Sequence, residues 1–172
     1  MARLLLILEL ALGAGNALYG QLVDEDKLKA VFLYNFLKFV EWPENMPMNP
    51  ACICVLGESS VMAPLEQIAG NNPGLVIRQI SGAREASGCQ IIFFGSPDRK
   101  RWRPALDDIN GDPKIKGVLT VAEADGFVSA GGAMNLKTEG GQIRIQVNPA
   151  AAEKEKLRIS SKLLSLAQIV RK

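Results

Sequence analysis

Three cysteines carry the most informative chemistry in this sequence: Cys52, Cys54 and Cys89. No histidine occurs, so the commonest metal ligand and the commonest general base are both missing. No close Cys/His cluster exists to hold zinc, and a serine or cysteine nucleophile would have no imidazole to activate it. The sequence therefore predicts no catalytic residue, no metal and no cofactor.

Carboxylates and basic residues give no specific site. The acidic pairs Glu25-Asp26 and Asp107-Asp108 fall at an expected helix start and on a polar helix face, where solvated charges are ordinary. A hydrolase with a carboxylate site is an alternative for which nothing in the sequence selects the residues. Lysine and arginine total 20 against 18 aspartate and glutamate, a net charge of +2, which argues against nucleic acid as a partner.

The first twenty residues have the layout of a secretory signal peptide. Arg3 precedes a short apolar run from Leu4 to Leu12, and small residues follow it. Ala17 and Gly20 each offer a small residue at which cleavage could occur. We expect an exported, periplasmic protein whose mature domain covers residues 21–172. The alternative is that these residues form an amphipathic first helix of a cytoplasmic protein.

The pattern of apolar runs predicts the fold class. Continuous apolar runs predict buried strands, and they alternate with helical segments at residues 61–69 and 101–109. Two further segments alternate apolar and polar residues around Glu139-Gly-Gly141, which predicts a hairpin. We expect a single three-layer α/β sandwich, with a mixed, mainly parallel sheet, helices on both faces and a C-terminal antiparallel hairpin. The buried strands are expected at residues 51–56, 75–80, 89–94 and 117–121, and the hairpin at 133–138 and 142–147.

Two helical segments are expected to close the chain. The first covers residues 150–157. The second covers residues 160–170 and would direct apolar side chains, Leu166 among them, toward the core.

The expected sheet brings the cysteines together. Cys52 and Cys54 share one face of their strand because side chains alternate along a strand. In a doubly wound sheet of order 2-1-3, the strand that begins at Cys89 lies beside theirs. Cys89 could then pair with Cys54, or with Cys52 if the register slips by two residues. The alternative is that all three are buried free thiols.

A helix expected from Asp24 to the Trp42-Pro43 step is unusually aromatic. Its apolar residues recur at three- and four-residue steps, at Leu28, Val31, Phe32, Phe36, Phe39 and Val40. It is either a central core helix or a helix with one core face and one partner or ligand face. We consider Phe39 and Trp42 as interface anchors, with Arg158 and Lys162 adding charge-assisted contacts. The alternative is that both aromatic residues are core and both cations are solvated.

Several segments in order resemble the YfiR-like family. The first is Lys29-Ala-Val-Phe-Leu-Tyr-Asn-Phe-Leu-Lys-Phe-Val-Glu-Trp-Pro43, followed by Ile53-Cys-Val-Leu-Gly57 and Cys89-Gln-Ile-Ile-Phe-Phe94. The similarity continues to about Val170 through three closing segments, Gly131-Gly-Ala-Met-Asn-Leu136, Ile143-Arg-Ile-Gln-Val-Asn148 and Leu157-Arg-Ile-Ser-Ser-Lys-Leu-Leu164.

This resemblance implies a small periplasmic regulator, often a homodimer. It implies repression of a YfiN-type inner-membrane diguanylate cyclase by contact with its periplasmic part, which lowers cyclic di-GMP and bears on biofilm regulation. A YfiB-type outer-membrane lipoprotein would sequester the regulator. The family's recurrent cysteine pair maps onto Cys54 and Cys89, whereas a second pair found near Gly131 in some relatives is absent here.

A small-molecule sensor is the rival prediction. Its ligand would bind in an apolar cleft near Trp42, with Arg144 or Arg158 holding an anionic group.

Overall fold

The computed structural model describes residues 13–171, with side chains from residue 25 onward. The expected signal peptide at residues 1–20 therefore lies largely outside the described residues. Helix α1 (Gly13–Phe39) begins before Asp24, where we expected its start, and runs past both Ala17 and Gly20. Within residues 13–171, no helix is long and apolar enough to cross a membrane.

The buried face of α1 differs in part from the expected one. Ala30, Leu33 and Phe36, at steps of three, form its buried contact with the core, and Val40 directly after the helix continues it. Leu28 and Val31 are 45% and 43% exposed, so their assignment to the core face was wrong. The stripe covers about 60° on either side of Leu33, and Leu28 and Val31 fall well outside it.

Seven strands form the main sheet, in the order β3-β2-β4-β5-β6-β7-β9. The first five in this order run parallel, β7 is antiparallel to β6, and β9 is parallel to β7. The expected order of the first three strands is thus confirmed, as is the hairpin. The strands are β2 (Ala51–Leu56), β3 (Leu75–Ile80), β4 (Ile91–Phe94), β5 (Leu119–Ala122), β6 (Met134–Glu139), β7 (Gln142–Val147) and β9 (Gln168–Ile169).

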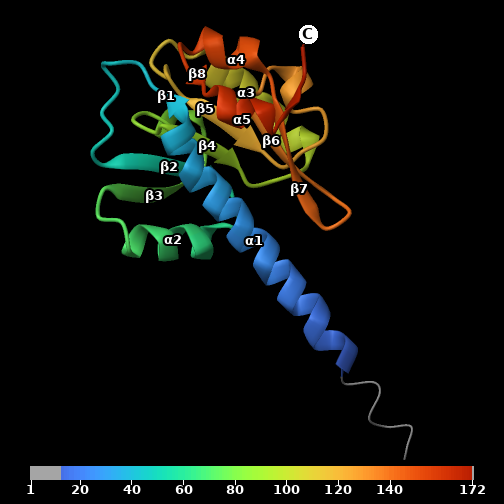
Figure 1. The fold of residues 1–172 in the computed structure, drawn as a ribbon. Helices are drawn as coiled ribbons and strands as arrows, with labels where there is room; N and C mark the ends of the chain where they lie inside the picture. Colours follow the sequence, from blue (N-terminus) through green and yellow to red (C-terminus); the bar gives the residue numbers. More distant parts are fainter. Residues whose placement is uncertain (1–12, 172) are drawn as a thin grey trace, which may run out of the picture.

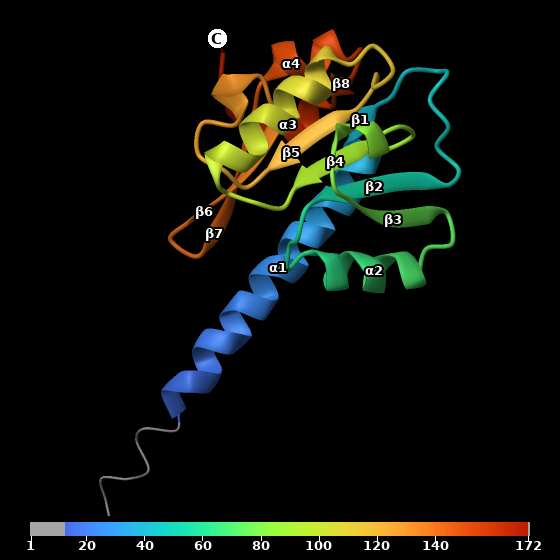
Figure 2. The same ribbon diagram turned by 180° about the vertical axis from the view of Figure 1, so that it is seen from behind.

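Alternate residues of the central strands enter two separate cores. Ile53 and Val55 of β2 pack under α1 and α2 (Met62–Gly70), whereas Cys52 and Cys54 face α3 (Arg99–Gly111). Helices therefore cover both faces of the sheet, as Figures 1 and 2 show from opposite sides. The predicted three-layer α/β sandwich is confirmed.

The C-terminal segment differs most from expectation. The chain forms α4 (Pro149–Lys154), β8 (Arg158–Ile159) and α5 (Ser161–Ser165), and then ends its regular structure with β9. The predicted helix over residues 160–170 was wrong because the chain leaves α5 to pair with the open edge of β7, where Val170 N–H donates to the Val147 carbonyl at 2.8 Å. Leu166, expected in the core, is 72% exposed.

A disulfide links β2 to the segment that enters β4. It joins Cys54 to Cys89, whose Cα atoms are 5.8 Å apart, and Cys52 is a buried free thiol. The bridge closes a loop with a sequence separation of 35 that contains α2 and β3. It therefore covalently restrains the part of the chain that forms one edge of the sheet.

Replacing Cys89 by alanine tests this restraint. We expect Cys89→Ala to lower the free energy of unfolding by about 2–4 kcal/mol, because the unfolded chain regains the entropy that the closed loop denied it. Cys52→Ala is the matched control, since it also removes one buried sulfur but keeps the bridge. Urea unfolding measures both variants, and equal midpoints would contradict the expectation.

Candidate functional site

A cavity of about 850 Å³ opens at the carboxyl edge of the parallel strands. We call it the edge cavity. Residues directly after β2, β4 and β5 line it, among them Glu58, Gly95 and Glu123, and α1 adds Asp26. Open α/β sheets bind ligands at this edge, where the strand order reverses. Here the reversal lies at β2, which has β3 on one side and β4 on the other.

Gly95 allows the loops at this edge to approach closely. A Cβ atom at Gly95 would lie 2.6 Å from the Glu58 carbonyl oxygen, which is too close for any side chain. A second cavity, of about 690 Å³, lies against α3 and shares Glu58, Gly95 and Pro97 with the first. Glycine at this position therefore brings the ends of β2 and β4 together between the two cavities.

A buried lysine holds Glu123, one of the residues that line the edge cavity. Lys29 is only 4% exposed, and its Nζ lies 2.6 Å from both Glu25 Oε1 and Glu123 Oε2. The Thr138 hydroxyl donates to Glu25 Oε1 at 2.5 Å. This group, which we call the Lys29 clasp, ties α1 to the end of β5 and to β6.

The clasp shifts the pKa values of its members. Burial lowers the pKa of Lys29, but its hydrogen bonds to Glu123 and Glu25 raise it more, so it stands above the ordinary value. Hydrogen bonds from Lys29 and Thr138 lower the pKa of Glu25. Lys29 and Glu25 are therefore both charged at neutral pH, and the attraction between the two charges offsets the cost of removing them from water.

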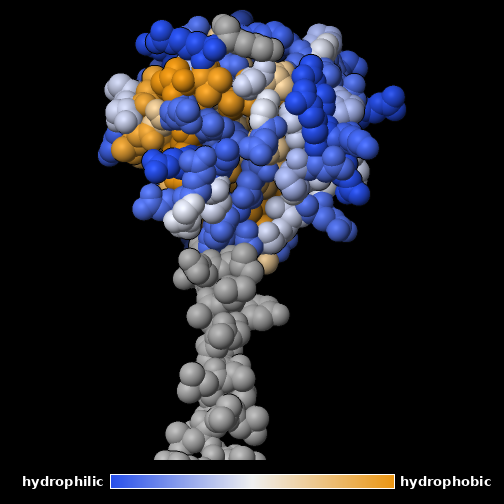
Figure 3. Space-filling view, turned by 90° about the vertical axis from the view of Figure 1, so that its right-hand side faces the viewer, coloured by the Kyte–Doolittle hydropathy of each residue, from blue (hydrophilic) through white to orange (hydrophobic). Residues whose placement is uncertain are grey.

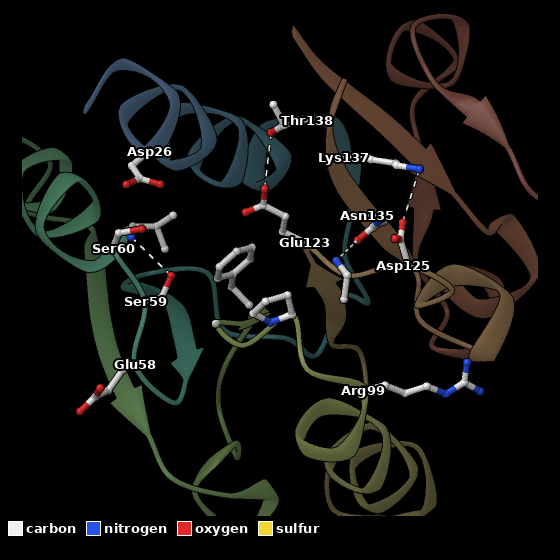
Figure 4. A pocket seen from close by; sticks show the side chains of 15 residues that line it. Asp26, Glu58, Ser59, Ser60, Arg99, Glu123, Asp125, Asn135, Lys137 and Thr138 are labelled. Atoms are coloured by element: carbon white, nitrogen blue, oxygen red, sulfur yellow. Dashed lines mark hydrogen bonds and ion pairs between the residues drawn. The ribbon is translucent and has the colours of Figure 1, made fainter. Parts of the chain in front are cut away.

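The open part of the cavity carries charges of both signs. Figure 4 shows Glu123 near its centre, with Asp26, Ser60 and Glu58 on one side and Lys137 on the other. Lys137 Nζ lies 3.4 Å from Asp125 Oδ1. Such a lining suits a small polar molecule that carries opposite charges.

The cavity carboxylates are not arranged to hold a metal. Among the described residues, the one His/Cys/Asp/Glu group close enough for shared coordination is the cysteine trio, and two of its sulfurs are bonded to each other.

Four of the five residues proposed from the sequence come together at the C-terminal end of α1. β1 (Val40–Glu41) pairs with β8, and Ser160 N–H donates to the Phe39 carbonyl at 2.9 Å. Lys162 Nζ lies 5.6 Å from the centre of the Phe39 ring, and Arg158 Nε lies 3.5 Å from Glu41 Oε2. Phe39, Trp42, Arg158 and Lys162 form what we call the aromatic–cationic surface.

Both aromatic residues of this surface are half-buried. Trp42 Nε1 donates to the Leu37 carbonyl at 3.2 Å, which fixes the indole against the end of α1. Arg158 and Lys162 are exposed beside them. The arrangement combines rigid aromatic area with mobile positive charge.

Arg144 lies elsewhere. It sits on β7 opposite Lys137, and its Nε is 3.7 Å from Glu139 Oε2 in the β6–β7 hairpin. The neighbouring Thr138 contacts Glu25, which is fourteen positions, or about 21 Å of helix, from Phe39. Arg144 therefore lies nearer the middle of α1, whereas the aromatic–cationic surface lies at its C-terminal end.

Two large apolar side chains near the end of the chain, Leu166 and Ile169, are exposed, and we call them the apolar patch. Figure 3 shows that apolar side chains also gather on one face of the molecule. Contiguous exposed apolar area commonly marks an interaction site. The patch follows α5, which also carries Lys162 of the aromatic–cationic surface.

The edge cavity was not predicted from the sequence, although polar residues that line it follow two of the predicted strands. Glu58-Ser59-Ser60 follows one predicted buried strand, and Glu123 and Asp125 follow another. The carboxyl ends of parallel strands share one edge, so the proximity of these residues could have been inferred from the predicted strands, but this inference was not made. The rival sensor's ligand was instead placed near Trp42 and Arg158. The hollow that Arg158 lines measures about 170 Å³, and Trp42 is not part of its lining.

Removing the Lys29 charge should destabilise the fold. We expect Lys29→Met to lower the free energy of unfolding by about 1–3 kcal/mol at pH 7, less than for a fully buried pair because Glu123 is partly exposed. Lys137→Met is the control: Lys137 also pairs with two carboxylates, but it is more exposed, and its loss should change stability by less than about 0.5 kcal/mol.

The same variant should change the response to acid. A lowered Glu25 pKa contributes stability above its unfolded value of about 4.3, and this contribution is lost as pH falls through the folded value. The unfolding free energy of the wild type should therefore drop more steeply below about pH 5 than that of Lys29→Met. Urea unfolding at several pH values measures this, and parallel curves would contradict it.

The comparisons with known proteins concern the family and the fold. A family described as YfiR/HmsC-like matches residues 26–168, whereas no curated protein matches the chain. A conserved domain protein from Vibrio cholerae O1 biovar El Tor superposes with a TM-score of 0.57 at 15% identity, over 86% of this chain and 60% of that one. An ABC domain in complex with L-Trp from Streptococcus pneumoniae gives 0.47 at 12% identity, over 73% and 57%.

The structural likenesses describe the fold alone, and this chain spans about 60% of the length of the Vibrio protein. The family match over residues 26–168 includes the edge cavity, the aromatic–cationic surface and every member of the Lys29 clasp except Glu25. The chain belongs to the YfiR/HmsC-like family.

Proposed function

We propose that this protein is a non-catalytic periplasmic regulator that represses a YfiN-type membrane diguanylate cyclase by contact, and so lowers cyclic di-GMP. The observation that carries the proposal is the family match over residues 26–168, together with the aromatic–cationic surface that the matched residues form. The disulfide supports export, because such bridges persist in oxidising compartments.

The aromatic–cationic surface is the proposed contact with the cyclase. Tryptophan and arginine are enriched among residues that dominate binding energy, and here Trp42 and Arg158 lie on adjoining segments joined by the β1–β8 pair. The half-buried rings lose little freedom on binding, since the fold already holds them. A YfiB-type lipoprotein that sequesters the regulator would compete for the same residues.

The apolar patch at Leu166 and Ile169 is the proposed surface for a second copy of the chain. It adjoins the aromatic–cationic surface through α5, so a homodimer would place two cyclase-binding surfaces near one another.

Charge reversal tests the proposed contact. The protein is titrated into membranes that carry the cyclase, and cyclic di-GMP formation from GTP is measured. We expect the wild type to inhibit, and Arg158→Glu to raise the half-inhibitory concentration at least about tenfold, as loss of a dominant contact does. Arg158 is exposed, so the variant should fold.

Arg144→Glu is the matched control, because Arg144 is an exposed arginine in the β6–β7 hairpin, away from the C-terminal end of α1. It should leave the half-inhibitory concentration within about twofold of the wild type. An inactive wild type would contradict the proposed function. Equal effects of the two reversals would contradict the proposed surface.

Ligand sensing is a second candidate function, favoured by the edge cavity. Its volume of about 850 Å³ lies within the range of small-molecule sites, and its lining suits a zwitterion. We expect at least one of the standard L-α-amino acids to raise the melting temperature, because a ligand that binds only the native state stabilises it by about 2.7 kcal/mol at a hundred times its Kd.

Glu58→Gln should abolish that shift, since Glu58 lines the cavity and makes no ion pair within residues 25–171. Glu153→Gln, an exposed glutamate on α4, is the control and should keep the shift. An unchanged melting temperature with every amino acid would contradict the proposed ligand class.

A further inference from the structure

Three sulfur atoms gather on the α3 side of the sheet. The Sγ atoms of Cys52, Cys54 and Cys89 all lie within 4.8 Å of one another, and the Sγ atoms of Cys52 and Cys54 are 3.7 Å apart. All three residues are buried. A free thiol is therefore held permanently beside a disulfide, with no room for the groups to separate without a change in side-chain conformation.

Arg78 of β3 lies against this cluster. Its Nη2 donates to Cys54 Sγ at 3.3 Å and to Cys89 Sγ at 3.1 Å, and to the carbonyls of Glu85 and Ser87 at 3.0 and 2.9 Å. The two carbonyls fix the guanidinium in place. A positive charge so placed stabilises any thiolate that forms on either sulfur.

The strand pairing gives Cys89 two partners within reach. Gln90 N–H donates to the Cys52 carbonyl at 2.9 Å, so Cys52 lies directly beside Gln90. The Sγ atoms of Cys52 and Cys89 lie within 4.8 Å of each other, so a change in side-chain conformation could bring them into bonding distance. The observed partner, Cys54, has a Cα separation from Cys89 of 5.8 Å.

We propose that Cys52 takes part in thiol–disulfide exchange, so that the bridge alternates between Cys54–Cys89 and Cys52–Cys89. The Cys52 thiol gives its proton to solvent and its sulfur attacks Cys89 Sγ. As the Cys52–Cys89 bond forms, the Cys54–Cys89 bond breaks, and its electron pair leaves on Cys54 Sγ, which Arg78 stabilises before it takes up a proton. One thiol and one disulfide are present before and after, so no oxidant or reductant is needed.

The rate of this exchange depends on how readily the Cys52 thiol loses its proton. Burial raises the pKa of the Cys52 thiol, and the nearby charge of Arg78 and its hydrogen bond oppose that rise. Exchange requires the thiolate form of Cys52. Burial disfavours this form, and the positive charge of Arg78 partly offsets that effect. The alternative product, a Cys52–Cys54 bridge, would join Cα atoms about 6.6 Å apart along one strand, at the upper limit for a disulfide.

Exchange would move the disulfide's attachment point on β2 from Cys54 to Cys52, two residues earlier in the strand. Cys52 stands near the start of β2, where its backbone N–H is held by the Gln90 side chain, which in turn donates to the Pro47 carbonyl at 2.6 Å. The alternative bridge would therefore tie the segment that leads into β2 more directly to Cys89. This inference does not depend on the proposed partner or ligand.

The position of the free thiol tests the proposal. The oxidised protein is kept at pH 8.5 without reductant until its labelling pattern is constant, then unfolded in acid and labelled with N-ethylmaleimide. Ile53 separates Cys52 from Cys54, so peptide fragmentation assigns the label. We expect label on Cys54 in at least about 1% of chains, the population of an accessible second state, and less in a sample kept at pH 4.

Two cysteine variants give an independent measurement. After mild oxidation, Cys54→Ser should contain a Cys52–Cys89 bridge and no free thiol, whereas Cys52→Ser should keep the observed bridge as the only isomer. Arg78→Gln should slow equilibration of the wild-type cysteines by roughly tenfold, the effect of losing one charge-assisted hydrogen bond to the leaving thiolate.

Label confined to Cys52 at pH 8.5 would overturn the proposal. So would two free thiols in oxidised Cys54→Ser. If Cys54→Ser does not fold, the wild-type labelling decides alone, because it requires no substitution.

Discussion

Burial of the parallel sheet on both faces is the constraint on which the rest of the structure depends. Strands covered on both sides must be apolar at every position, and β2 and β4 are. Alternation then sends Ile53 to one core and Cys54 to the other. The disulfide and the free thiol lie on the α3 side for this reason, while α1 must cover the opposite side. With both faces occupied, the strand ends are where polar side chains can gather.

The same constraint explains which elements could be predicted from the sequence. β2 and β3 were predicted with their observed limits. β2 is a continuous apolar run bounded by proline and glycine, and β3 follows the Asn71-Asn-Pro-Gly74 turn, so both have local signals. β8 and β9 contain two residues each and exist because β1 and β7 offer unpaired edges. A two-residue strand is too short to give a recognisable pattern of apolar residues, so residues 160–170 were predicted as one helix from their leucine spacing.

Prediction of the candidate site was limited in a similar way. Phe39 and Trp42 stood out by residue type, and the pairing of β1 with β8 places Arg158 beside them. The Lys29 clasp could not be predicted, since neighbouring lysines on the same helix differ from Lys29 only in their angle to the sheet. Lys29 precedes Ala30 of the buried stripe and meets Glu123, whereas Lys27 is exposed. The sequence placed Arg144 on a strand of the hairpin, but it could not show that this strand lies away from Trp42 and Arg158.

Helix α1 connects the two candidate sites. Its Asp26 lines the edge cavity beside the Lys29 clasp, and its Phe39 belongs to the aromatic–cationic surface, about 20 Å away along the same axis. A ligand in the cavity can alter binding at the surface only if it favours one of two arrangements of the protein over the other. The clasp is where such a preference would act, because it determines whether α1 stays fixed to β5 and β6 at the cavity end.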